Sequence, residues 1–125
     1  MFKKRTRNVA LRVIKLVDAL PNSRAADVIG RQLLPSATSI GANYRAACRS
    51  RSAADMVSKL SITEEEADEA LCWLELLAQS NTVASPRLEP LRKEIGEIVA
   101  MTVTSIKTLR ARPIQNPKSK IQNLK

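Results

Sequence analysis

Arginine side chains repeat between residues 24 and 51 in a pattern suited to binding phosphate. Four of them fall within about 60° of one another on a helix wound at about 100° per residue, and a fifth follows directly. These are Arg24, Arg31, Arg45, Arg49 and Arg51. A guanidinium group presents its N–H donors as a planar fork that matches phosphate oxygens, so the pattern favours a nucleic-acid-binding face. Periodicity alone leaves a second interpretation open, in which the same face is solvated or pairs with acidic residues of the chain.

Sequence-specific base recognition has little support. The chain contains one residue each of Phe, Tyr and Trp, so it lacks the aromatic platforms on which single-stranded bases stack. Binding through the arginines is therefore expected to be independent of sequence, to either DNA or RNA.

Catalytic and metal-binding chemistry is poorly supported as well. Histidine is absent, which removes His-based acid–base catalysis and most zinc or di-iron sites. The acidic run from Glu64 to Glu69 places Glu65 and Glu69 on one helix face, but its successive carboxylates fan around the helix and do not converge on an ion. Cys48 and Cys72 lack the spacing of a ligand or redox pair, and we interpret them as small, partly buried residues. We expect no metal, no cofactor and no enzymatic activity.

The charge of the chain is divided into blocks. Its 125 residues carry a formal net charge of +9. Residues 1–59 hold 12 basic and 3 acidic side chains, residues 60–100 hold 3 basic and 9 acidic, and residues 101–125 hold 6 basic and none acidic. Such asymmetry indicates an anionic partner or charge pairing between segments. No apolar run reaches the roughly 18 residues that span a bilayer, and no signal peptide is recognisable, so we expect a soluble cytoplasmic protein without a membrane partner.

Apolar residues recur at helical spacing in four segments, approximately residues 6–20, 24–49, 53–79 and 87–111. Residues typical of turns and helix caps separate them. Four amphipathic helices with short connections predict an all-α fold, an antiparallel up-down four-helix bundle, over residues 1–112. Residues 113–125 contain two copies of a polar pentapeptide and are expected to form a disordered basic tail.

The third segment carries a second apolar group opposite its core face. This strip consists of Ile62, Trp73 and Leu76. A helix that is apolar on two faces usually has neighbours on both, so the strip predicts an interface between copies of the chain.

Several residues in the first two thirds of the chain resemble a known family. They are Leu20-Pro21, Gln32-Leu33, Ser39-Ile40, Asn43 and Glu64-Glu65-Glu66-Ala67. This pattern resembles the four-helix-bundle proteins encoded in intervening sequences of bacterial large-subunit ribosomal RNA genes. That family is similar in turn to the accessory variability determinants of diversity-generating retroelements. The chain departs from many members after the Asn, where it reads Tyr44-Arg45-Ala46-Ala47 in place of an Ile-Ala-Glu-Gly turn.

The resemblance adds expectations of its own. It implies a homo-oligomer of five subunits, nucleic-acid binding through a basic surface, no enzymatic activity, and an accessory role beside a reverse transcriptase or another nucleic-acid enzyme. The residues and the resemblance together predict a non-catalytic, self-associating bundle that binds nucleic acid non-specifically. The alternative is a protein-interaction scaffold whose basic patch docks an acidic protein.

Overall fold

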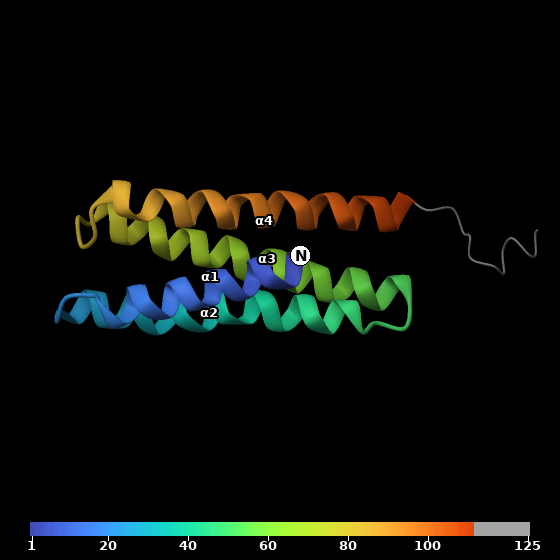
Figure 1. Cartoon of the computed structure of the whole chain (residues 1–125), viewed down its shortest axis with the longest axis horizontal. Helices are drawn as coiled ribbons and strands as arrows, with labels where there is room; N and C mark the ends of the chain where they lie inside the picture. The colour runs from blue at the N-terminus through green and yellow to red at the C-terminus, as the bar shows by residue number, and fades with distance from the viewer. Residues whose placement is uncertain (112–125) are drawn as a thin grey trace, which may run out of the picture.

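The structure is a computed structural model that describes residues 1–111, and within this range the chain forms four helices and no strand (Figure 1). They are α1 (Phe2–Asp18), α2 (Arg24–Cys48), α3 (Ala53–Gln79) and α4 (Ser85–Ala111). The expected tail, residues 113–125, lies outside the described residues. None of the four helices is long and apolar enough to cross a membrane.

Consecutive helices pack against each other in antiparallel pairs, α1 on α2, α2 on α3 and α3 on α4 (Figure 1). The connecting turns are too short to cross the length of the bundle, so each helix must fold back along the one before it. A smaller contact between α1 and α4 closes the fourth side. The predicted antiparallel up-down bundle is confirmed.

Serine side chains begin the second and third helices. Ser23 accepts a hydrogen bond on its Oγ from the backbone N–H of Ala26 at 3.1 Å, and Ser52 accepts one from Asp55 at 3.0 Å. Each bond satisfies a backbone donor that the first helical turn leaves free. The carboxylate of Asp55 pairs with Lys59 at 3.3 Å, so only the serine half of a capping box forms at α3.

Helix α2 runs through Pro35 without ending there. The hydroxyls of Ser36 and Ser39 donate to the backbone carbonyls of Gln32 and Pro35, at 3.0 and 2.7 Å, which confirms that these serines bond the backbone around the proline. Asn43 borders the apolar face of α2, a position that suits a hydrogen bond to another helix. Its Nδ2 instead donates at 2.9 Å to the Ser39 carbonyl of the same helix.

Helix α1 begins earlier than the apolar periodicity predicts, at Phe2 instead of residue 6. The ring of Phe2 packs edge-on against Tyr44 of α2, with 4.4 Å between centroids and 71° between ring planes. An edge-to-face aromatic pair of this kind adds about 0.5–1.5 kcal/mol to the area that it buries. This tertiary contact explains why the first turn is helical although its sequence is mostly basic.

The bundle has four helices over only part of its length. At 1.5 Å per residue α1 is about 26 Å long, whereas α3 and α4 are each about 40 Å long. In Figure 1 the start of α1 lies near the middle of the bundle, and α2, α3 and α4 continue beyond it. The main aliphatic core lies where all four helices meet, and a smaller cluster around Ala47, Leu60 and Ile106 fills the three-helix end.

Candidate nucleic-acid interface

The five arginines predicted to bind phosphate are all exposed, four of them in or directly after α2 and Arg51 in the turn that follows. They do not form one site. Arg24 is the first residue of α2 and Arg49 follows its last, so about 37 Å of helix separates them. The structure therefore divides the predicted stripe into one group at each end of α2, and the two groups have different surroundings.

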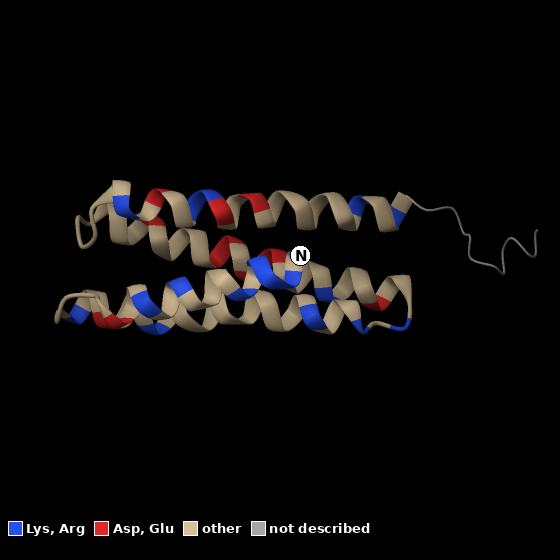
Figure 2. Cartoon of the chain, in the orientation of Figure 1, with Lys and Arg blue, Asp and Glu red and all other residues tan. Residues whose placement is uncertain are grey.

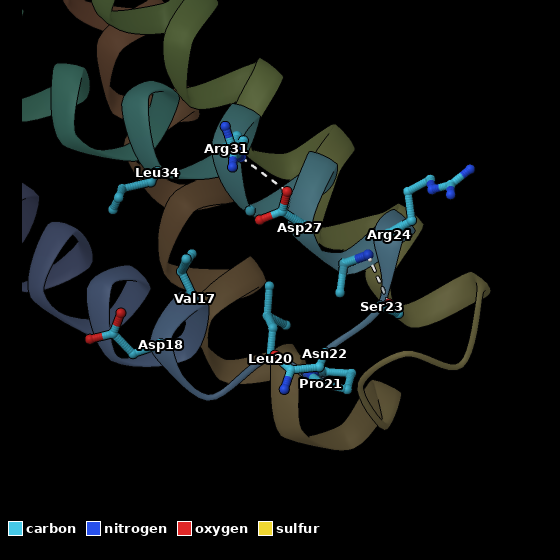
Figure 3. A pocket seen from close by; sticks show the side chains of 12 residues that line it. Val17, Asp18, Leu20, Pro21, Asn22, Ser23, Arg24, Asp27, Arg31 and Leu34 are labelled. Carbon is cyan, nitrogen blue, oxygen red and sulfur yellow. Dashed lines mark hydrogen bonds and ion pairs between the residues drawn. The ribbon is translucent and has the colours of Figure 1, made fainter.

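The group at the α1–α2 turn lies among carboxylates. Arg24 and Arg31 border an open hollow of about 640 Å³ that Asp18 and Asp27 also line (Figure 3). The Nε of Arg31 lies 3.0 Å from the Asp27 carboxylate, one helical turn away, while Arg24 extends away from that pair. Two cations beside two carboxylates leave no net charge at this end. This half of the stripe is better described by the alternative of ion pairing on a solvated face.

The group at the α2–α3 turn has a different environment. In Figure 2 the charged residues on the half of α2 next to this turn are all basic, while both acidic and basic residues lie at the other end. Within residues 1–111, Arg45, Arg49 and Arg51 have no carboxylate within 4.0 Å of their charged nitrogens. Their positive charge is therefore free to attract an external anion.

Helix α1 adds two basic residues that the sequence pattern did not identify. Lys3 and Arg7 lie across the α1–α2 groove from Arg45 and line the same hollow. We use the name basic surface for these residues together with the arginines at the α2–α3 turn. The basic surface comprises Lys3, Arg7, Arg45, Arg49 and Arg51. Lys3 and Arg7 could have been predicted from the antiparallel folding of consecutive helices, because it places the start of α1 beside the second half of α2.

Two glycines set the distance between α1 and α2. A Cβ built on Gly41 would lie 3.2 Å from Thr6 Oγ1, and one on Gly30 would lie 3.3 Å from side-chain carbons of Val17 and Leu20. Both distances are tighter than ordinary carbon contacts, so the helices approach closely because these positions lack side chains. The expectation that a neighbouring helix packs closely on the glycine flank is confirmed, and that neighbour is α1.

Arg5 links α1 to α4. Its Nε and one terminal nitrogen donate to the two oxygens of Glu94 at 2.7 and 2.8 Å, and the same terminal nitrogen donates to Glu97 at 2.7 Å. Hydrogen bonds from Arg5 hold the pKa of the Glu94 carboxyl below its usual 4.5 and raise the pKa of the guanidinium. Arg5, a basic residue of the block 1–59, is thus neutralised by acidic residues of the block 60–100.

Replacing Arg5 by Gln is expected to lower the free energy of unfolding near neutral pH by about 1 kcal/mol, since the pair is bidentate but about one quarter exposed. A carboxyl with a lowered pKa stabilises the fold above its unfolded pKa, and this contribution is lost as the pH falls through its folded pKa. The difference between variant and wild type should therefore shrink well below pH 4.5. Urea unfolding near neutral pH and well below pH 4.5 measures this difference, with Lys93→Gln as control. If Arg5→Gln lowers the free energy of unfolding equally at the two pH values, the ion pair between Arg5 and Glu94 is not its cause.

The acidic run of α3 does not gather into a metal site in the described part of the chain. No group of three or more His, Cys, Asp or Glu side chains within residues 1–111 is placed to hold an ion. The carboxylate of Glu69 instead accepts a hydrogen bond from the indole N–H of Trp73 at 3.1 Å. The acidic residues thus border the apolar strip.

The apolar strip of α3 is only partly accessible. Ile62 and Leu76 are exposed on the outer face of the helix, whereas Trp73 is half-buried and packs partly against the main core. The structure brings the three residues onto one side of α3, next to Glu65 and Glu69.

The cysteines are exposed free thiols, so the expectation that they are partly buried is wrong. They lie on the outer faces of α2 and α3, which no other helix covers. Burial, together with a hydrogen bond to Cys48, raises the pKa of the Tyr44 hydroxyl to about 12. At neutral pH this phenol is therefore protonated and does not act as a base.

Comparison with known proteins gives a consistent result. Residues 2–104 match a family model described as 23S rRNA-intervening sequence protein. A crystal structure of a protein of unknown function from the S23 ribosomal protein family, from Bacteroides thetaiotaomicron, is 34% identical and superimposes with a TM-score of 0.80. The match covers 86% of this chain and 99% of that one. No curated protein sequence matches.

Proposed function

Since this chain belongs to the family of 23S rRNA-intervening sequence proteins, we propose that it is a non-catalytic, self-associating bundle that binds nucleic acid through its basic surface. The observation that carries the proposal is the set of five cations on α1, α2 and the following turn, none paired with a carboxylate within residues 1–111. Some cations elsewhere are paired with carboxylates, as at Arg5 and Arg31, and others are not; the basic surface is distinguished by gathering its unpaired cations on neighbouring elements. A cluster left unpaired suits the phosphates of a nucleic-acid backbone.

The surroundings of the basic surface support binding without sequence preference. All three aromatic residues of the chain, Phe2, Tyr44 and Trp73, are at least half-buried and so offer no stacking platform. Contacts from guanidinium and ammonium groups to phosphates position a protein on a nucleic acid but read no bases. The expected ligand is therefore a DNA or RNA backbone.

Self-association is the second part of the proposal, and the expected partner of the apolar strip is another copy of the chain. The strip is flanked by Glu65 and Glu69, while the outer face of α1 carries exposed Leu11 and Ile14 beside Lys15. These faces complement each other in hydrophobicity and in charge. A contact between two different faces joins copies of the chain head to tail. The row of copies closes into a ring where the rotation between neighbouring copies allows it. The family resemblance implies five subunits in that ring, which would repeat the basic surface and add many weak phosphate contacts.

Replacing Arg45 and Arg49 by Ala is expected to weaken binding to a short labelled DNA duplex about tenfold or more near physiological salt, and equally for unrelated sequences. Each phosphate contact releases condensed counterions, so the slope of log affinity against log salt should become shallower by about 0.9 for each phosphate that is no longer neutralised. Helix content should not fall, because Ala is the better helix former and both side chains are exposed. Fluorescence anisotropy over a salt series, with duplex DNA and with RNA, measures both quantities.

The matched control replaces Arg87 and Lys93 of α4 by Ala. Both are exposed and form no ion pair within residues 1–111, whereas Arg92 pairs with Glu89 at 3.4 Å and is less suitable. Equal losses of affinity in the two double variants would mean that only net charge matters and that the basic surface is wrong. If the wild type binds neither DNA nor RNA even at low salt, a scaffold that docks an acidic protein becomes the better description.

A further inference from the structure

The groove between α1 and α2 has the features of a specific anion site inside the basic surface. It borders an open hollow of about 240 Å³, enough room for a compact ligand. Lys3 and Arg7 line it from α1, and Arg45 lines it from α2. Positive charge therefore reaches the hollow from both walls, and no carboxylate is among the residues that line it.

Small residues create the hollow. Gly41 has no side chain, and a Cβ there would lie 3.2 Å from Thr6 Oγ1, so the two helices nearly touch at the floor of the groove. Ala10 and Ala42 continue the lining on either side, and their methyl groups leave the space above them open. The groove is thus narrow at its floor and bordered by long cationic side chains.

The donors present in the groove identify the kind of ligand. The Thr6 hydroxyl donates to the Lys3 carbonyl at 3.0 Å, and the Thr38 hydroxyl donates to the Leu34 carbonyl at 2.8 Å. Both hydroxyl protons are therefore engaged within the helices. The donors left are the guanidinium groups of Arg7 and Arg45 and the ammonium of Lys3, which favour a compact anion over a neutral sugar or base.

Three cations around one hollow attract an anion, because opposite charges attract and the cations' contributions add. Within residues 1–111 no carboxylate lies within 4.0 Å of the charged nitrogens of Lys3, Arg7 or Arg45. All three side chains are therefore available to an anionic ligand.

We propose that this groove holds a backbone phosphate of the bound nucleic acid, with Arg7 and Arg45 gripping its oxygens from opposite walls and Lys3 adding a point charge. The inference rests on the proposed function and sharpens it, because it selects one position on the basic surface as the principal phosphate site. A guanidinium on each wall can donate two parallel N–H bonds, and an ammonium supplies charge without fixed geometry.

Ala42→Glu tests the groove directly, because Ala42 is an exposed helix residue on its lining. A carboxylate there should pair with the neighbouring cations, weaken binding of a short labelled DNA duplex about tenfold, and make the salt slope shallower by about 0.9 for the one phosphate that the groove no longer neutralises. Ala100→Glu on α4, also an exposed helix residue, changes the net charge equally and should have a much smaller effect. Ala42→Lys should strengthen binding, while Ala100→Lys should not.

The outcomes separate the groove from the wider proposal. A larger effect at position 42 than at position 100, with opposite signs for Glu and Lys, supports the groove. Equal effects at the two positions, with wild-type binding intact, would overturn the groove and leave the proposed function standing. A wild type that binds no nucleic acid would overturn both. Circular dichroism of each variant checks that the helices are retained, and the Lys variant gives a gain of binding that misfolding cannot imitate.

Discussion

Replacing Leu76 by Glu is expected to convert the proposed oligomer into single chains. Leu76 lies on the outer face of α3 with 40% of its surface exposed in the single chain, on the same side of the helix as Ile62, Glu65 and Glu69. A second copy that covers this strip buries Leu76 against apolar side chains, where a carboxylate is left without a partner. A buried unpaired charge costs several kcal/mol, enough to disrupt an interface of modest size.

Light scattering coupled to size exclusion, at about 10–50 µM protein, measures the result, because a complex with a micromolar or lower Kd is populated at such concentrations. Val28→Glu is the matched control: Val28 is an aliphatic residue, 51% exposed, on α2 and away from the strip. We expect the control to keep the mass of the wild type. A wild type that elutes as a single chain, or a control that dissociates equally, would show that the α3 strip is no interface.

Replacing Leu74 by Ala is expected to lower the free energy of unfolding by about 2–5 kcal/mol. Leu74 is fully buried on the inner face of α3, in the main aliphatic core. Removing its isobutyl group loses the transfer free energy of the buried carbons and leaves a cavity that the surrounding helices cannot close completely. For a domain whose total stability is about 5–15 kcal/mol this is a large share.

Urea unfolding followed by circular dichroism measures this loss, and the transition midpoint should fall while its slope is unchanged. Leu71→Ala is the natural comparison, because Leu71 belongs to the same helix but is only half-buried at the edge of the core. Leu71→Ala should lower the free energy of unfolding clearly less than Leu74→Ala does. If both variants lose the same stability, the core is centred elsewhere than the packing indicates. Since self-association also adds apparent stability, both variants are compared at one protein concentration.

The short first helix connects the fold to the proposed function. This helix begins beside Tyr44, where Phe2 packs, and its first turns place Lys3 and Arg7 next to Arg45. The basic surface is thus formed where four-helix packing gives way to three-helix packing.

The sequence by itself determined the fold class and most of the helix boundaries. The predicted and observed starts agree at α2 and α3, because serine caps and turn residues are local signals that act within a few positions. The core faces also followed from periodicity alone: Leu33, Ile40 and Ile95 were placed on inner faces and are fully buried. Aliphatic side chains at helical spacing form one apolar face, and that face is buried against whichever helix packs on it. Predicting the core face therefore required no knowledge of which helix that is.

Tertiary structure alone decided which charges meet. Periodicity assigned Arg5 to the outer face, but packing of α1 on α4 pairs it with Glu94. Helical periodicity grouped Arg31 with Arg45 on one face of α2. In the structure Arg31 pairs with Asp27, and Arg45 lines the same groove as Arg7. The physical reason is that helical spacing reports the direction in which a side chain points, while its partners depend on the length and register of the neighbouring helix. Close packing at Gly30 and Gly41 brings α1 against α2, and the cations of both helices then line one groove.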